Sequence, residues 1–297
     1  MIAEGSELTS GKILKGIGGF YYVKTPEGEI IECKARGKFR NVSLKPYCGD
    51  NVLIDISDGK GTVSEILPRA NFFIRPPVAN IDAMIIVMSC ANPGPDYTFV
   101  DKMLAICSAS AVDAVVCMTK TDLVNNEKIA AFESVYRLAG CDVYKVCNLD
   151  GGGDTDKIRT LLNGRTTAFA GFSGVGKSSL LNNITGEYVM HTGSVSERLG
   201  RGKHTTRHVE LVDYSGGYVV DTPGFGSLEL TNIEPENLKN CFPEFAAYED
   251  KCRFADCMHL STKWCGVYDA VCDGLIAQSR YDNYKSFYKL LKDKKEW

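Results

Sequence analysis

Short apolar runs separated by turn residues fill the first part of the chain. Within residues 11–67 the β-prone stretches are GKILKGIGGFYYVKT, EIIECKARG, DNVLIDIS and GTVSEIL. Short strands at such close spacing, with glycines between them, are typical of a small barrel. The pattern therefore predicts an N-terminal barrel domain over residues 1–70. The stretch 68–77 is rich in proline, and we interpret it as a linker.

The hydrophobic pattern changes over residues 81–222. Apolar strand-like runs alternate there with helical stretches such as 127–139 and 177–184, the runs being AMIIVMSC, DAVVCMTK, VYKVC, TTAFAGF and GYVVDT. This alternation predicts a parallel sheet with helices on both faces, in an α/β domain over residues 71–232. The remaining residues, 233–297, are polar, cysteine-bearing and helical, and predict a third domain.

Composition places the chain among ordinary globular proteins. Of its 297 residues, 44% are hydrophobic and 24% are charged, and the net charge of −3 says little about partners. No run of eighteen apolar residues and no export signal is found, so no membrane association is expected. Most of the twelve cysteines lie in apolar runs, as Cys90, Cys107 and Cys117 do. Free thiols in a reducing cytoplasm are the better interpretation.

A phosphate-binding loop is predicted at residues 171–178, where GFSGVGKS fits the pattern G-x-x-x-x-G-K-[ST]. It follows a strand-like run and precedes a helical one, the context that the motif requires. Backbone N–H groups and the helix N-terminus would hold phosphate oxygens, and Lys177 would reach the β- and γ-phosphates. The alternative is an ordinary glycine turn. The predicted nucleotide-binding residues here are Gly171, Phe172, Ser173, Gly174, Val175, Gly176, Lys177, Ser178 and Ser179.

Two further segments fit the switch regions of a nucleotide hydrolase. Asp221 and Gly224 belong to DTPG, which follows a strand-like run; the carboxylate suits a magnesium site and the glycine N–H a γ-phosphate. In the glycine-rich and basic loop 200–206, Thr205 or Thr206 would complete with Ser178 the coordination of Mg²⁺ bound with GTP. The alternative for this loop is a solvated, flexible segment.

A guanine-reading motif is predicted at Thr119, Lys120, Thr121 and Asp122, which resemble N-K-x-D. The carboxylate of Asp122 would accept hydrogen bonds from guanine N1 and N2, a donor pair that adenine lacks. The motif precedes the phosphate loop by about fifty residues, the reverse of the ordinary order. A circularly permuted GTPase domain explains that order and leaves the end of the second switch region free to carry another domain.

The catalytic group is predicted to be His204. Ras-like enzymes place a glutamine shortly after D-x-x-G to orient the attacking water, whereas the residues after Gly224 here are FGSL. Hydrolysis by the protein alone is therefore expected to be slow, with His204 orienting the water. The alternative is a surface histidine.

A metal site is predicted in the C-terminal domain, where three cysteines and one histidine fall within fourteen residues. Cys252, Cys257, His259 and Cys265 form a Cys₃His set, a standard closed zinc site. We expect one structural Zn²⁺ per chain, which would supply much of the folding free energy of this domain. Cys241 and Cys272 are alternative ligands, but we expect both to pack in the core. Unliganded buried cysteines are the alternative for the whole cluster.

Basic residues gather in the predicted barrel within twelve positions that contain no acid, at Lys34, Arg36, Lys38, Arg40 and Lys45. Phe39 and Tyr47 lie among them. Barrels of the oligonucleotide-binding (OB) type bind nucleic acid by such a combination of cations and aromatic rings. The C-terminal tail adds Lys289, Lys292, Lys294 and Lys295. A solvated charged face is the alternative for each, and for the tail alone it is preferred.

Taken together, these motifs resemble the RsgA (YjeQ/YloQ) family of ribosome-biogenesis GTPases over essentially the whole chain. The matching segments are RGKFR, RPPVANID, TKTDL, GFSGVGKSSLLN, GRGKHTT, DTPGF and CRFADCMH with the later cysteine. Two departures are Thr119, where asparagine is common, and Cys147-Asn148, where a Ser-Ala type pair usually contacts the base.

The resemblance implies an OB-type barrel, a permuted GTPase domain and a C-terminal zinc domain. It further implies a cytoplasmic protein, expected to be a monomer, that binds the small ribosomal subunit and its rRNA late in assembly. The subunit would stimulate hydrolysis of GTP to GDP, and the family implicates the switch-loop histidine, here His204. The competing hypotheses are a small-molecule P-loop kinase or ATPase, which Asp122 disfavours, and a zinc-stabilised RNA-binding protein with a vestigial nucleotide site, which the intact Gly176-Lys177-Ser178 disfavours.

Overall fold

The computed structural model describes residues 8–37, 39, 45–57, 59–147, 152–185, 209–221, 225, 228–230 and 233–295. The chain divides into two compact units. The first comprises residues 1–82, 162–168 and 189–225, and the second comprises residues 83–161, 169–188 and 226–297. In the described parts of the chain, no helix is both long and apolar enough to cross a membrane.

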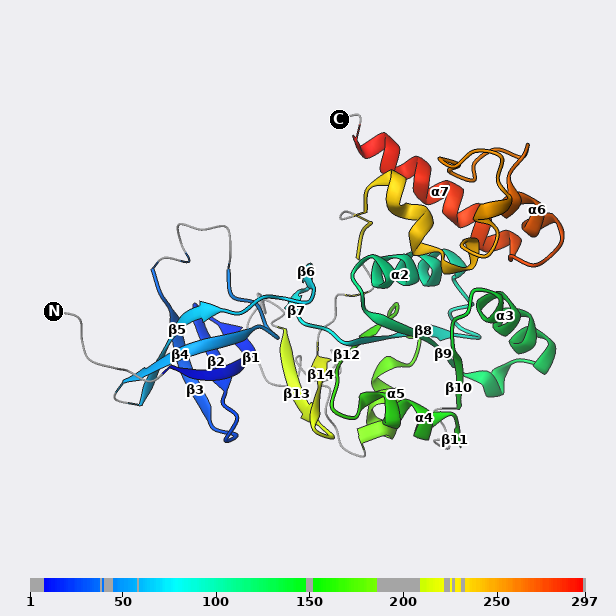
Figure 1. Ribbon diagram of the computed structural model, residues 1–297. Coiled ribbons are helices and arrows are strands. Elements are labelled where there is room, and N and C mark those ends of the chain that lie inside the picture. Colours follow the sequence, from blue (N-terminus) through cyan, green and yellow to red (C-terminus); the bar gives the residue numbers. More distant parts are fainter. Residues whose placement is uncertain are drawn as a thin grey trace. The chain divides into compact units, whose positions relative to one another are not determined.

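The first unit begins with a closed five-stranded barrel (Figure 1). Its strands are β1 (Thr9–Ile17), β2 (Phe20–Lys24), β3 (Ile30–Ala35), β4 (Asn51–Ser57) and β5 (Lys60–Ile66). They pair in the order β1-β2-β3-β5-β4, and pairing of β4 with β1 closes the barrel. Alternate residues such as Ile13, Val23, Val52 and Val63 are fully buried inside it. The predicted N-terminal barrel is thereby confirmed.

The proline-rich stretch is a short hairpin, so its interpretation as a linker was wrong. Strand β6 (Phe72–Ile74) pairs antiparallel with β7 (Pro77–Ala79). The side chain of Asn71 fixes the base of the hairpin, since its Oδ1 accepts from the backbone N–H of Ile81 at 2.9 Å and its Nδ2 donates to the Ile81 carbonyl at 2.8 Å. Proline is tolerated because it occupies the turn and the first position of a strand.

Three further strands are β12 (Thr166–Ala170), β13 (Glu210–Tyr214) and β14 (Gly217–Asp221), of which β13, β14 and the first three residues of β12 belong to the first unit. Strand β14 runs parallel to β12 and antiparallel to β13. The barrel strand β1 pairs with β13 at Lys15 and Glu210, whose side chains form an ion pair of 2.8 Å. A hairpin between the two predicted switch segments is therefore attached to the barrel.

The second unit contains the strands β8 (Ala83–Ser89), β9 (Asp113–Thr119), β10 (Val143–Cys147) and β11 (Gly152–Gly153). Strands β8, β9 and β10 are parallel, and all seven residues of β8 are buried, as expected for a strand covered on both faces. Helix α2 lies on one side of these strands and α5 on the other (Figure 1). The helices are α2 (Tyr97–Ala109), α3 (Asn126–Leu138), α4 (Thr155–Leu162) and α5 (Lys177–Thr185), with a 3₁₀ turn η1 (Thr121–Leu123).

The C-terminal part of the second unit consists of short helices around an aromatic core. Its elements are the 3₁₀ helices η3 (Pro235–Cys241), η4 (Pro243–Phe245) and η5 (Glu249–Lys251), and the helices α6 (Gly266–Cys272) and α7 (Gln278–Lys295). The rings of Phe242, Phe245 and Tyr284 pack edge to face or stacked, with centroids 5.0–5.3 Å apart. Such contacts hold together a segment that has few aliphatic residues.

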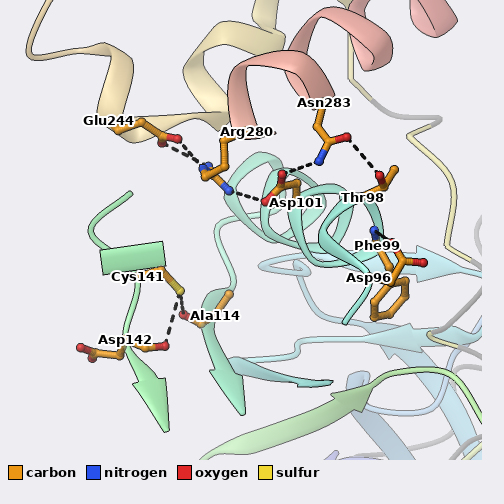
Figure 2. Close-up of polar contacts among 10 residues, drawn as sticks. All are labelled: Asp96, Thr98, Phe99, Asp101, Ala114, Cys141, Asp142, Glu244, Arg280 and Asn283. Atoms are coloured by element: carbon orange, nitrogen blue, oxygen red, sulfur yellow. Dashed lines mark hydrogen bonds and ion pairs between the residues drawn. The ribbon is translucent and has the colours of Figure 1, made fainter. Parts of the chain in front are cut away.

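Helix α7 is joined to α2 by a buried group of polar side chains (Figure 2). Arg280, 2% exposed, donates to Asp101 of α2 at 2.8 Å and also to the carboxylate of Glu244. Asn283 donates to the second oxygen of Asp101 at 2.6 Å. Because Arg280 and Asp101 are buried, each depends on the other for compensation of its charge.

Candidate nucleotide site and metal centre

The predicted phosphate loop connects β12 to helix α5, in the context that the motif requires. A Cβ atom on Gly171 would lie 2.5 Å from the carbonyl oxygen of Val87, so only glycine fits there. Gly174 and Gly176 have φ angles of +80° and +95°, a conformation that side chains disfavour. The backbone path of the loop therefore requires glycine at these three positions. That path is the one that lets N–H groups converge on an anion.

Lys177 is bound to the loop that it follows. Its ammonium group donates to the carbonyl oxygens of Gly171 at 2.6 Å and Phe172 at 2.7 Å. Burial lowers the pKa of Lys177, and a phosphate oxygen beside the ammonium group would reverse that shift. The ring of Phe172 packs on Phe99 of α2 with centroids 4.5 Å apart. This places the start of α2 against the phosphate loop.

The predicted guanine motif lies at the end of β9 and is hydrogen-bonded to the phosphate loop. The hydroxyl of Thr119, fully buried, donates to the carbonyl of Val175 at 2.5 Å. Lys120 has a left-handed backbone, and its ammonium group donates to the carbonyl of Gly174 at 2.8 Å and to that of Asn92. Two segments that are about fifty residues apart in the chain therefore form one site.

Asp122 is exposed at the edge of this site. The thiol of Cys147, at the end of β10, donates to its Oδ1 at 3.5 Å, and the hydroxyl of Thr121 donates to the carbonyl of Val146 at 3.4 Å. The end of β10 therefore lies beside the carboxylate that is predicted to read the base.

The contact between Lys120 and Asn92 was not predictable from the sequence. The segment ANPGPD, from Ala91 to Asp96, contains turn residues but no motif, so no signal in it indicated a contact with the guanine motif. The contacts that define this loop come from residues far away in the chain, and the structure is needed to find them.

The predicted switch residues are only partly covered by the structure. Asp221 is the last residue of β14, and the parallel register places Val220 beside Ala168 of β12, the strand that leads to the phosphate loop. The other four lie outside the described residues, namely Gly224, His204, Thr205 and Thr206.

The predicted metal ligands come together as one cluster. The ligand atoms of Cys252, Cys257, His259 and Cys265 all lie within 4.8 Å of one another. His259 Nδ1 is 3.6 Å from the Sγ atoms of both Cys252 and Cys265. A tetrahedral zinc ion with bonds of about 2.3 Å to sulfur and about 2.0–2.1 Å to nitrogen would separate those atoms by about 3.6 Å. The donor set and its geometry therefore fit a tetrahedral metal ion.

The surroundings of the cluster orient its ligands. The other ring nitrogen of His259 lies 3.2 Å from a carboxylate oxygen of Glu249, as in many metal sites where a carboxylate orients the histidine. Backbone N–H groups of His259 and Tyr268 donate to the sulfurs of Cys257 and Cys265, both at 3.4 Å. Such donors stabilise thiolates. The cluster can therefore hold a metal ion with four protein ligands and no open position.

The two alternative ligands are not part of the cluster. Cys241 is buried, as expected, and its thiol donates to the carbonyl of Asn237. Cys272 is exposed, so the expectation that it packs in the core was wrong. It occupies the last position of α6, where the helix surface faces solvent. All twelve cysteines are free thiols.

A basic and aromatic cavity of about 460 Å³ opens on the barrel. It is lined by Phe20, Tyr21, Lys34, Arg36, Phe39 and Lys45, together with backbone of the β1–β2 turn. Lys34 lies over the ring of Phe20, 5.0 Å from its centroid. Tyr47 does not line the cavity, because its ring is covered by the guanidinium of Arg69 at 4.5 Å. Lys38 and Arg40 lie outside the described residues.

Solved structures of two known proteins share this architecture. The crystal structure of YloQ, a circularly permuted GTPase, aligns with a TM-score of 0.80 at 35% identity, covering 99% of this chain and 98% of that chain. The crystal structure of YjeQ from Thermotoga maritima aligns with a TM-score of 0.81 at 35% identity, covering 96% and 99% of the two chains. The fold and the order of the motifs define a circularly permuted GTPase.

Sequence comparison gives the family. The model of the RsgA GTPase matches residues 66–231, and that of the RsgA N-terminal domain matches residues 10–63. The protein named small ribosomal subunit biogenesis GTPase RsgA from Agathobacter rectalis is 42% identical over 302 residues, covering 97% of this chain and all of that protein. The chain belongs to the RsgA GTPase family. The predicted family, permuted GTPase fold and class of enzyme are thereby confirmed.

Proposed function

We propose that this protein binds the small ribosomal subunit late in its assembly and hydrolyses GTP to GDP and phosphate when the subunit stimulates it. The relative from Agathobacter rectalis is named a small ribosomal subunit biogenesis GTPase. The observation that carries the proposal is the pair of hydrogen bonds from Thr119 and Lys120 to the phosphate loop. They join a guanine motif and a phosphate loop into one site, as a GTPase requires.

The nucleotide is held in this proposal by the guanine motif and the phosphate loop. Asp122 reads the N1 and N2 hydrogens of guanine, and Lys120 lies along the base plane. Backbone N–H groups of residues 171–179 and the ammonium group of Lys177 bind the phosphates. In this assignment, Asp221 contributes to the magnesium site and the backbone N–H of Gly224 binds the γ-phosphate. Mg²⁺ enters with GTP, ligated by Ser178 and by Thr205 or Thr206.

Hydrolysis depends on a group other than glutamine. No glutamine follows Gly224 in FGSL, so the protein alone lacks the residue that Ras-like enzymes use to orient water. We assign that role to His204. Slow turnover in isolation follows, and acceleration by the subunit gives the protein a way to be released once the subunit is mature.

The metal at the Cys₃His cluster is proposed to be one zinc ion per chain, ligated by Cys252, Cys257, His259 and Cys265. With four protein ligands it has a structural role, because a catalytic zinc keeps one position for water or substrate. A zinc ion would cross-link this segment of the chain, because its first and last ligands, Cys252 and Cys265, are thirteen residues apart.

Three functional domains are proposed, with boundaries at 1–70, 71–232 and 233–297. The barrel contacts rRNA through the cavity lined by Lys34, Arg36 and Lys45. The permuted domain binds GTP and GDP, and the zinc domain follows directly after the second switch. Action on ribosomal subunits implies a cytoplasmic protein, which we propose acts as a monomer without membrane association.

The test is GTP turnover by the full chain with and without purified small ribosomal subunits. We expect slow hydrolysis alone and strong stimulation by subunits, with GTP binding far tighter than ATP. Equal binding of ATP would instead support the small-molecule kinase or ATPase. Absence of nucleotide binding with retained RNA binding would support a vestigial site. Large ribosomal subunits serve as the control, and no stimulation by small subunits would refute the proposal.

A further inference from the structure

An exposed aromatic pair stands beside the metal cluster. Phe254 is 52% exposed and Trp264 is 59% exposed, and their rings meet edge to face with centroids 6.3 Å apart. The guanidinium of Arg253 lies over the ring of Trp264 at 4.6 Å. Two large rings exposed side by side form an apolar patch of the kind that marks a binding surface. An indole with a guanidinium over one face still offers its other face for stacking.

The backbone of Trp264 is in a conformation that tryptophan rarely adopts. Its φ angle is +58°, which lies in the left-handed region. Glycine adopts this conformation without strain, whereas a bulky residue there is an outlier. Because more than half of the Trp264 side chain is exposed, its burial offsets little of the cost of this backbone conformation. An outlier of this kind motivates a functional explanation for the side chain that it presents.

The residues of this surface are adjacent in the chain to two predicted metal ligands. Arg253 directly follows the predicted ligand Cys252, and Trp264 directly precedes the predicted ligand Cys265. The backbone N–H of Arg253 donates to the carbonyl of Trp264 at 3.0 Å, so the two segments that carry these residues are also joined by a hydrogen bond. Metal binding therefore holds the rings in place, and little rotamer freedom is left to lose when a ligand stacks on them.

We propose that Arg253, Phe254 and Trp264 form a stacking platform for an unpaired RNA base. This proposal rests on the proposed function, in which the partner is a particle rich in RNA. A base has a flat π-face that matches an exposed indole, and its phosphate supplies a counter-charge for the guanidinium. Arg253 forms no ion pair with any residue in the described part of the chain. A purely apolar protein partner would bury that cation without compensation.

The platform differs in charge from the barrel cavity. Charges over residues 248–264 are balanced, with three cations and three acids in the segment, namely Lys251, Arg253, Lys263, Glu249, Asp250 and Asp256. Attraction of RNA to the platform therefore comes from stacking, whereas the barrel attracts phosphates through Lys34, Arg36 and Lys45. Removing the Trp264 ring should lower RNA affinity by a factor that changes little with salt, while removing a barrel lysine should reduce the salt dependence itself.

The test uses tryptophan fluorescence of the full chain, which has two tryptophans. In a Trp297→Phe background, Trp264 is the single emitter. We expect a twelve-nucleotide oligouridylate, a twelve-nucleotide oligoadenylate and purified small subunits each to quench this emission, because a stacked base deactivates the indole. Chelating the metal should abolish the quenching by the oligonucleotides.

Binding of fluorescently labelled oligoadenylate, followed by anisotropy, tests the residues one by one. Trp264→Gly removes the ring and relieves the left-handed backbone, so we expect an unchanged or higher melting temperature, retained metal and roughly fivefold to hundredfold weaker RNA binding. Phe254→Ala and Arg253→Gln should weaken binding as well. Leu290→Ala, which removes an apolar side chain 46% exposed on α7, is the matched control and should leave binding unchanged.

The outcomes separate this proposal from the proposed function. Subunit-stimulated GTP turnover without any quenching of Trp264 by RNA or subunits would overturn the platform and leave the proposed function standing. Quenching by subunits but not by oligonucleotides or by rRNA freed of protein would assign the platform to a ribosomal protein, and so overturn it as an RNA site. Absence of stimulation with quenching by RNA would overturn only the proposed function.

Discussion

The hydroxyl of Thr119 lies 2.5 Å from the carbonyl oxygen of Val175, fifty-six residues further along the chain. The pattern N-K-x-D, which residues 119–122 resemble, has an asparagine at this position. Here a buried hydroxyl tethers the motif to the phosphate loop, and Lys120 adds a second tether to Gly174. The base site and the phosphate site are therefore fixed to each other although permutation has reversed their order in the sequence.

The tether predicts the effect of Thr119→Val. Valine keeps the shape of threonine but removes the donor, which leaves the carbonyl of Val175 without that bond. Losing such a bond costs about 1–3 kcal/mol, so we expect GDP affinity to fall roughly fivefold to hundredfold. Thr119→Ser keeps the hydroxyl and is the matched control. Titration with a fluorescent GDP analogue measures both, and equal affinities of the two variants would contradict the tether.

Base choice is predicted to follow Asp122. Asp122→Asn replaces a carboxylate, which only accepts hydrogen bonds, with an amide that accepts one and donates another. Guanine N1–H and N2–H₂ then lose their pair of acceptors. Xanthine has an oxygen, O2, in place of the amino group, and this oxygen gains a donor. We expect GTP affinity to drop by at least tenfold and xanthosine triphosphate affinity to rise. Competition binding of the two nucleotides measures the exchange. A loss of both affinities in a folded protein would mean that Asp122 does not contact the base.

The parts of this site that could be predicted from the sequence are those that local motifs define. The glycines of the phosphate loop and the spacing of Cys252, Cys257, His259 and Cys265 are set by short-range geometry, so the pattern alone indicates them. The parallel strands were likewise indicated by apolar runs such as the one at β8, because a strand buried on both faces has no polar positions.

Features that depend on distant partners were not predictable. The proline-rich stretch was interpreted as a linker because the hydrogen bonds of Asn71 to Ile81 cannot be read from composition. The burial of Arg280 was not anticipated either, because its partners Glu244 and Asp101 are 36 and 179 residues away in the chain. A buried and an exposed arginine look alike in a sequence.

Metal removal is predicted to unfold the C-terminal part of the second unit. Cys257→Ser removes one ligand from the closed set, and zinc content measured by plasma mass spectrometry should fall from one per chain to well below that. The melting transition should broaden and shift downward because metal binding and folding are coupled. Cys272→Ser changes an exposed cysteine outside the cluster and should retain the metal. Full metal content in Cys257→Ser would contradict the ligand set.

The assignment of His204 is tested by His204→Ala. If His204 orients the attacking water, GTP turnover stimulated by small subunits should fall by roughly tenfold to a thousandfold, while GDP affinity stays nearly unchanged. His208→Ala, four residues further on in the same sequence segment, is the control. Unchanged turnover of the His204 variant, measured as phosphate release, would exclude the histidine from hydrolysis.

The last prediction concerns the buried network of Arg280. Removing the guanidinium in Arg280→Ala leaves the carboxylates of Asp101 and Glu244 without their cation, which costs about 3–5 kcal/mol of unfolding free energy. Lys294→Ala is the matched control on the same helix, because its ion pair with Glu229 is exposed and contributes at most about 1 kcal/mol. Denaturant unfolding monitored by circular dichroism compares the two variants.

The same variant should show a defined pH dependence. Burial raises the pKa of Asp101 above its ordinary 3.8, and Arg280 and Asn283 offset part of that shift. Without Arg280 the pKa of Asp101 rises further. The folded variant therefore keeps a proton on Asp101 up to a higher pH than the unfolded chain does. Its stability therefore decreases as the pH rises through that window. We expect the stability loss caused by Arg280→Ala to be smaller at about pH 5 than at about pH 7.5. A loss that is equal at both values would show that Asp101 is not the group left uncompensated.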